Sequence, residues 1–178
     1  AHLSQVINAE MEYLNSLNCL VEDKKCLAEE IQERYRLDQL IRADFEHLSL
    51  CGAYAETHQD LCRSLFMGSI VFQIDLPNTK RLKEIISVHG FPSAPVFNKE
   101  TQIAAWFIVQ HAQFIGLSGS PIWDVDLAES IMPNVKKAVS EGSLTPWHYA
   151  AMYDRIALNR GKSQRYATQY QCDAGKAL

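Results

Sequence analysis

Apolar residues recur along most of the chain at the three- and four-residue spacing that is typical of amphipathic helices. Turn residues and prolines divide this pattern into six segments. The expected helices span residues 4–17, 23–50, 78–89, 100–112, 123–139 and 145–158. Between them, residues 69–75 (Ser-Ile-Val-Phe-Gln-Ile-Asp) are rich in β-branched side chains, and they are expected to be extended or to form a short strand.

The pattern therefore predicts a mainly α fold, a compact single domain over residues 1–178 with at most one or two short strands. The 100–112 segment is apolar nearly all round, so we expect it to be the central buried helix. Residues 114–121 contain glycines and serines and are expected to be a flexible loop. Pro133 should kink or restart its helix, and the polar tail from about residue 162 should be extended.

Composition narrows the classes of function. A chain of 178 residues that is 47% hydrophobic can bury a substantial core as one domain. The net charge of −4 argues against nucleic-acid binding, which needs a concentrated basic surface. No apolar run is long enough to span a membrane. We expect a cytoplasmic protein, although a chain that begins at Ala1 leaves export open.

The cysteines are five in number, and none forms a Cys-x-x-Cys pair. The odd count favours reduced thiols in the core. A disulfide between two of the first four (Cys19, Cys26, Cys51 and Cys62) is the less favoured alternative.

Polar residues stand on the apolar faces of three predicted helices, where a core would be expected. Asp38 and Arg42 fall in the middle of the apolar stripe of the 23–50 helix. Gln110 and His111 belong to the central helix, which has little exposed face. Asp154 shares a face with apolar residues of the last helix.

A buried charge is costly unless it is paired and hydrogen-bonded, so these groups either satisfy one another or line a cavity. For any single residue we favour a buried ion-pair network, such as Asp38 with Arg155 or Asp154 with Arg42. For the whole set we favour a site, because a histidine and a glutamine add little to a purely ionic network.

Several short motifs occur in a fixed order along the chain. They are Asp-Gln-Leu-Ile-Arg (38–42), Asp75 with Asn78, Gln110-His111, Asp154-Arg155 and Gln-Arg-Tyr-Ala-Thr-Gln (164–169). Together they resemble a bacterial family of unknown function marked by Asp-Gln-x-x-Arg, Gln-His, Asp-Arg and a C-terminal Gln-Arg-Tyr-Gly-Thr-Gln. The resemblance covers roughly residues 38–169 and implies that these polar positions belong together, without supplying a reaction. Ala167 stands at the family's glycine, where a positive φ becomes costly.

The first functional hypothesis is an enzyme that performs acid–base chemistry on a small anionic substrate. His111 would be the general acid or base, Gln110 would orient it or the substrate, and Asp154 would position arginines. The expected substrate-binding residues are Asp38, Gln39, Arg42, Arg155, Gln164, Arg165 and Tyr166. The guanidinium groups of the three arginines suit a carboxylate or a phosphate. Because no serine or cysteine stands out as a nucleophile, hydrolysis, elimination or isomerisation is favoured over covalent catalysis. No metal and no cofactor are expected.

The second hypothesis is a non-catalytic binding or immunity-type module that recognises a small anion or a partner protein. A metal site built from His111, Asp38 and Asp154 is a third and less favoured hypothesis, because most such sites use more than one histidine. The sequence pattern does not indicate which oligomeric state the protein has.

Overall fold

The computed structural model describes residues 9, 12–14, 16–17, 19–46, 64–65, 67–169, 172–173 and 176–177. Its long helices are α2 (Lys24–Glu46), α5 (Leu76–His89), α6 (Lys99–Gln110), α7 (Val125–Ser140) and α8 (Pro146–Asn159). The fold is mainly α, as the sequence predicts. Most of the expected 4–17 helix, and the end of the 23–50 helix, lie outside the described residues.

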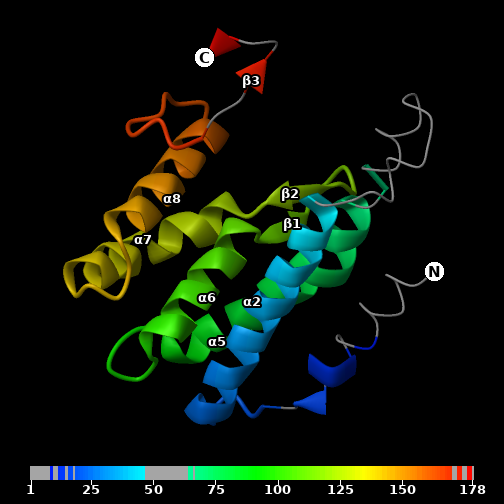
Figure 1. The fold of residues 1–178 in the computed structure, drawn as a ribbon, viewed down its shortest axis with the longest axis vertical. Helices are drawn as coiled ribbons and strands as arrows, with labels where there is room; N and C mark the ends of the chain where they lie inside the picture. Colours follow the sequence, from blue (N-terminus) through cyan, green and yellow to red (C-terminus); the bar gives the residue numbers. More distant parts are fainter. Residues whose placement is uncertain are drawn as a thin grey trace.

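Helix α6 is the centre of the fold, as its apolar composition predicts. It packs against α2 on one side and contacts α5 and α7, while α7 and α8 pair with each other (Figure 1). The main core draws on all five long helices, and Trp106 of α6 is 1% exposed within it. A smaller core joins Leu37 and Ile41 of α2 to Ile70 and Ile74.

Residues 67–89 form one continuous helical stretch, so the strand expected at 69–75 is wrong. Its middle is the π-helical turn η1 (Val71–Asp75). Ile70 and Ile74 are four residues apart and fully buried, whereas Phe72 is exposed, which is a helical pattern carried by β-branched residues. Pro77 follows and has no N–H to donate, and the wider turn before it accommodates this loss.

The Gly/Ser segment after α6 contains the loop expected from the sequence at residues 116–120, and the residues on either side of this loop form a β-hairpin. Strands β1 (Gln113–Ile115) and β2 (Pro121–Trp123) pair antiparallel. A side chain at Gly116 would collide with Ile122, since its Cβ would lie 2.4 Å from Ile122 Cδ1. The hairpin is fixed to α5 by the Gln113 N–H, which donates to Thr79 Oγ1 at 2.9 Å.

Helix α7 continues through Pro133 without restarting and is capped by Asp124, whose carboxylate accepts the Leu127 N–H at 3.1 Å. At the start of α8 the Thr145 N–H donates to His148 Nδ1 at 3.1 Å, so a histidine completes the cap that the Thr-Pro pair begins. The chain then ends in two short strands, β3 (Cys172–Asp173) and β4 (Lys176–Ala177), which pair with each other. Within the described residues, no helix is long and apolar enough to cross a membrane.

Candidate functional site

The buried carboxylate of Asp38 is the centre of a polar cluster between α2, η1 and the end of α6. Asp38 is 2% exposed, and its oxygens accept Arg42 Nε at 2.8 Å, His111 Nδ1 at 2.8 Å and Gln39 Nε2 at 2.8 Å. Arg42 also reaches Asp75, with Nη2 2.5 Å from Asp75 Oδ1. We call Asp38, Arg42, Asp75 and His111 the aspartate–histidine cluster.

Local structure explains how residues from three parts of the chain meet. Asp38 and Arg42 are one turn apart on the inward face of α2, which lets them form an i,i+4 ion pair. Asp75 is the last residue of the π-helical turn, a feature that often occurs at functional sites. His111 is the C-cap of α6, where the helix ends and the hairpin begins, and its side chain is 22% exposed.

The two aspartates of the cluster have opposite electrostatic environments. Burial disfavours the ionised form of Asp38, but hydrogen bonds and charges from His111 and Arg42 outweigh burial and hold its pKa below the usual value. Burial raises the pKa of Asp75 to about 6, with Asp38 adding to the rise and Arg42 opposing it. Asp38 is therefore an ionised anchor at neutral pH, and this makes Nδ1 the protonated nitrogen of His111. Asp75 can exchange a proton near neutrality.

Arg155 is the cation beside the cluster that lacks a carboxylate partner among the described residues. Its guanidinium lies 4.9 Å from the Trp123 ring centroid, and Nη1 donates to Gln110 Oε1 at 3.3 Å. Burial and the nearby charge of Arg42 lower its pKa, while Asp75 opposes this shift. A partly buried guanidinium without a carboxylate partner among the described residues is suited to bind an anion.

Gln110 contacts Arg155 and Met152, with Nε2 3.4 Å from the Met152 sulfur. It makes no hydrogen bond with His111 in this structure, and the other expected role of Gln110, orienting the substrate, stays a prediction. Asp38 holds the imidazole instead.

The ligand atoms of Asp38, Asp75 and His111 lie within 4.8 Å of one another, so these residues could hold a metal ion. Arg42 already engages both carboxylates, and a cation would have to displace it. Asp154, which we included in the alternative metal set, is not part of this group.

Asp154 is placed differently from our expectation, because it forms no ion pair with Arg42. It is fully buried, and its carboxylate accepts backbone N–H groups of Arg165, Tyr166 and Thr168 at 2.8–3.2 Å, together with the Thr168 hydroxyl at 2.9 Å. These bonds outweigh burial and lower its pKa. Asp154 thus anchors the segment that follows α8, and these bonds do not join it to the aspartate–histidine cluster.

The segment 163–169 also closes on itself. Gln164 Nε2 donates to the Gln169 carbonyl at 2.6 Å, and the Gln169 N–H donates to Gln164 Oε1 at 2.8 Å. Gln164 therefore has a structural role in this segment, and its expected role in binding substrate stays a prediction. Ala167 has φ +54°, the left-handed conformation that its position in the motif indicated.

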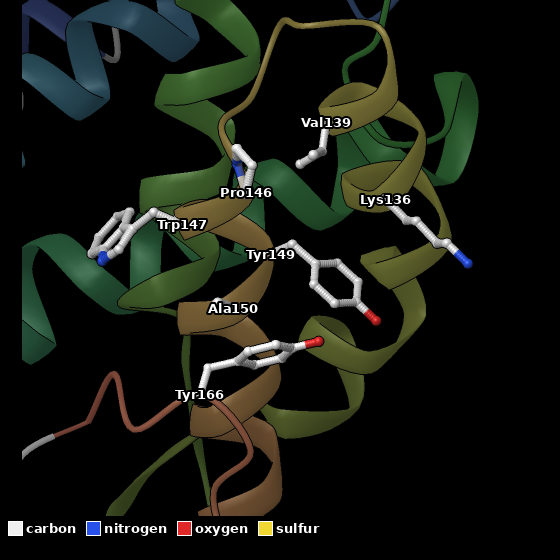
Figure 2. Close-up of a pocket in the computed structure, with 7 residues that line it drawn as sticks. All are labelled: Lys136, Val139, Pro146, Trp147, Tyr149, Ala150 and Tyr166. Atoms are coloured by element: carbon white, nitrogen blue, oxygen red, sulfur yellow. The ribbon is translucent and has the colours of Figure 1, made fainter.

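Arg165 and Tyr166 lie apart from the aspartate–histidine cluster in their contacts. The Arg165 guanidinium is 5.6 Å from the Tyr166 ring centroid, and Tyr166 lines a pocket of about 560 Å³ between α7 and α8. Figure 2 shows Tyr166 facing Tyr149 in this pocket. The expected site residues are therefore divided between two places in the molecule.

A second buried ion-pair group stands one turn further toward the start of α2, and our sequence reasoning missed it. Glu30 is 2% exposed and accepts Arg34 Nε and Arg81 Nε, both at 2.9 Å. Arg34 Nη1 donates to Asn78 Oδ1 at 3.1 Å. The signal was present, because residues 30, 34, 38 and 42 follow one another at four-residue spacing on one face.

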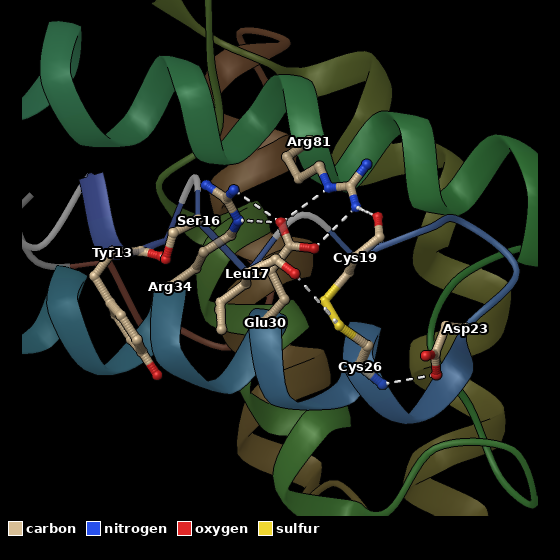
Figure 3. Close-up of a disulfide and its surroundings, with 9 residues drawn as sticks. All are labelled: Tyr13, Ser16, Leu17, Cys19, Asp23, Cys26, Glu30, Arg34 and Arg81. Carbon is tan, nitrogen blue, oxygen red and sulfur yellow. Dashed lines mark hydrogen bonds and ion pairs between the residues drawn. A yellow bond between two sulfur atoms is a disulfide. The ribbon is translucent and has the colours of Figure 1, made fainter.

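The chain forms a disulfide between Cys19 and Cys26, so the preferred expectation of reduced thiols is wrong for this pair. Figure 3 shows the bridge beside the ion pairs of Glu30, and Arg81 Nη2 donates to the Cys19 carbonyl at 2.8 Å. The disulfide ties the segment before α2 to the first turn of that helix. Cys51 and Cys62 lie outside the described residues.

Residues 37–175 match DUF6624, a family of unknown function, and the chain belongs to this family. The match begins beside Asp38 and includes both the aspartate–histidine cluster and the segment held by Asp154. No curated protein and no solved structure gives a significant match.

Proposed function

We propose that the protein is an enzyme that performs acid–base chemistry on a small anionic substrate at the aspartate–histidine cluster. The observation that carries this proposal is the pairing of an ionised Asp38 with His111 Nδ1, next to an Asp75 whose pKa is about 6. Two carboxyl groups whose environments push their pKa values apart are the usual arrangement for a base and an acid in one site.

The roles follow from the contacts. Asp38 fixes the tautomer of His111, so Nε2 is the nitrogen that can accept a proton. Nε2 has no hydrogen-bond partner among the described residues. Asp75, protonated in part near neutral pH, would return a proton to the substrate. One proton enters the protein at His111 and one leaves from Asp75, which suits elimination, isomerisation or hydrolysis by water.

Arg155 would bind the negative group of the substrate. Arg42 already pairs with two carboxylates, whereas Arg155 pairs with none among the described residues, so an anion is bound more favourably by Arg155. Trp123 and Gln110 hold the guanidinium in place before substrate arrives. This preorganisation lowers the entropic cost of binding.

A screen for turnover on small phosphate esters and on hydroxy and keto carboxylates tests this proposal. With any substrate found, His111→Gln should lower kcat by roughly 100-fold or more while the protein stays folded. Arg155→Gln should chiefly raise KM. His89→Gln is the matched control, because His89 contacts the Val21 carbonyl and is not part of the cluster.

The alternative is a module that binds an anion without turning it over. Arg155 supports it, since a guanidinium that has no carboxylate partner among the described residues can capture an anion without any proton transfer. Phosphate or carboxylate binding that Arg155→Gln abolishes, together with no turnover across the screen, would favour the module over the enzyme.

We also propose that the chain works in an oxidising compartment, in place of the cytoplasm that composition suggested. The Cys19–Cys26 bridge supports this, because disulfides persist outside the reducing cytosol. Alkylation of the protein directly from cells, followed by mass spectrometry, tests it. Cys19 and Cys26 that are fully alkylated before any reduction would reject the proposal.

A further inference from the structure

The pocket in Figure 2 is built from α7, α8 and the segment after α8. Its volume of about 560 Å³ lies in the range of small-molecule sites. The lining residues are Lys136, Val139, Pro146, Trp147, Tyr149, Ala150 and Tyr166. None of them belongs to the aspartate–histidine cluster, so the pocket needs an explanation of its own.

Two tyrosine rings form a corner of this pocket. The ring centroids of Tyr149 and Tyr166 are 6.4 Å apart, with 75° between the ring planes, and the Tyr153 ring lies 5.6 Å from that of Tyr166. The Tyr166 N–H is bonded to the buried carboxylate of Asp154, which fixes the backbone that carries the ring. Aromatic walls held in this way favour a flat ring, because stacking needs no rearrangement of the protein.

Three polar groups of the pocket have no partner among the residues that the structure describes. Neither the hydroxyl of Tyr149 nor that of Tyr166 makes a hydrogen bond within the described residues, and Lys136 makes no ion pair there. Figure 2 shows both hydroxyls turned to the same side as the Lys136 ammonium group. The neighbouring Lys137, by contrast, lies 3.7 Å from Glu141.

We propose that this pocket binds a small planar aromatic molecule that carries an anionic group. The ring lies against Tyr149 and Tyr166, with Val139, Pro146 and Ala150 as the apolar remainder of the wall. The negative group lies at the Lys136 ammonium, which lines the same pocket as the two tyrosine hydroxyls. A carboxylate and a phosphate both fit this chemistry.

Calorimetric titration of the full chain with four probes tests the proposal. Indole-3-acetate carries an aromatic ring with a carboxylate, and adenosine monophosphate carries one with a phosphate. Their relative affinity shows which of the two anionic groups the pocket prefers. Tryptamine keeps the ring but reverses the charge, and cyclohexylacetate keeps the charge without the aromatic ring. We expect at least one aromatic anion to bind about fivefold or more tightly than either control, with NMR shifts at the amides of Ala150 and Tyr166.

Variants locate the binding. Lys136→Gln should weaken the aromatic anion about three- to fivefold, the usual range for an exposed ion pair, and should leave tryptamine unchanged. Tyr166→Leu should weaken it about tenfold through lost stacking. Lys137→Gln and Tyr153→Phe are matched controls that should bind as the parent does, because neither residue lines the pocket.

Slow exchange of the Thr168 amide, which is bonded to Asp154, reports whether the segment remains folded in Tyr166→Leu. If that segment opens, Lys136→Gln and Tyr149→Leu decide the question instead. Absence of saturable binding by both aromatic anions would overturn the proposal. Equal affinity for tryptamine, or shifts that map elsewhere, would overturn it as well.

Discussion

Asp38 and Asp75 are both nearly fully buried and both bind Arg42, yet their pKa values shift in opposite directions. Asp38 accepts from three donors, so its ionised form is favoured in spite of burial. Asp75 accepts from Arg42 alone among the described residues, and one partner does not offset burial. The number of donors around each carboxylate decides which aspartate stays charged.

The pKa of Asp75 gives a pH-dependent contribution to stability. Because its folded value of about 6 lies above the unfolded value, the contribution is fully present below about pH 4 and is lost as pH rises through 6. We expect the stability of Asp75→Asn, relative to the parent, to increase between pH 4 and pH 8 by up to about 3 kcal/mol. Urea denaturation at several pH values measures this difference.

Asp126→Asn is the control for this titration, since the Asp126 side chain is 84% exposed. Its stability relative to the parent should change little over the same range. A constant difference between Asp75→Asn and the parent across this range would show that folding does not raise the pKa of Asp75.

Ala167 carries backbone strain that a glycine would relieve. A left-handed conformation costs an L-residue roughly 1 kcal/mol or more, and Ala167 has φ +54°. Ala167→Gly should therefore slow hydrogen exchange of the Thr168 amide about fivefold. Ser163→Gly in the same segment is the control and should not slow exchange, because its φ is not positive. Faster exchange in Ala167→Gly would contradict this account.

At the scale of elements, the ends of helices position two side chains of the aspartate–histidine cluster. The cluster takes Asp75 from the end of a π-helical turn and His111 from the C-cap of α6. At Asp75 the π-helical turn changes into the regular helix α5, and at His111 the helix α6 gives way to the β-hairpin. An irregular backbone can direct a side chain to a point that a regular helix cannot reach.

The disulfide stabilises the start of α2 by restricting the unfolded chain. It closes a loop between positions seven apart, which corresponds to a stabilisation on the order of 2 kcal/mol. Cys19→Ala with Cys26→Ala should therefore lower the free energy of unfolding by about this amount in urea. Reductant should destabilise the parent similarly and leave the double variant unchanged. A reductant effect that persists in the double variant would assign it to other cysteines.

At the scale of the whole molecule, buried polar groups on α2 join that helix to the rest of the fold. Glu30 is bonded to Arg81 of α5, and Arg42 connects α2 to Asp75 of η1. Asp38 connects the same helix to His111 at the end of α6. Since each link crosses between elements, losing one charge affects the packing of several helices together.

Arg42→Ala is the variant that should show this coupling. It leaves two buried carboxylates without their shared partner, so we expect a loss on the order of 3 kcal/mol or more at neutral pH. Arg36→Ala, on the exposed face of the same helix, should cost roughly 0.5 kcal/mol or less. An unchanged denaturation midpoint for Arg42→Ala would show that these ion pairs contribute nothing to stability.

The sequence by itself determined the helices and the polar positions on their inward faces. Periodicity alone identified α5, α6 and α8 and placed Asp38 within an apolar stripe, because these features depend only on local spacing. The same spacing could not separate a π-helical turn from a strand in the β-branched residues 69–75. Short segments of this kind take their form from the burial of Ile70 and Ile74.

Only the tertiary structure decided which polar groups meet. Sequence spacing placed both Asp154 and His111 on the inward faces of their helices. The inward faces of different helices, however, pack against different parts of the core. Asp154 is bonded to residues 165–168, whereas Asp38 is bonded to His111, 73 positions away. Contacts between distant parts of the chain depend on how helices cross, and the pattern of one helix contains no information about its neighbours.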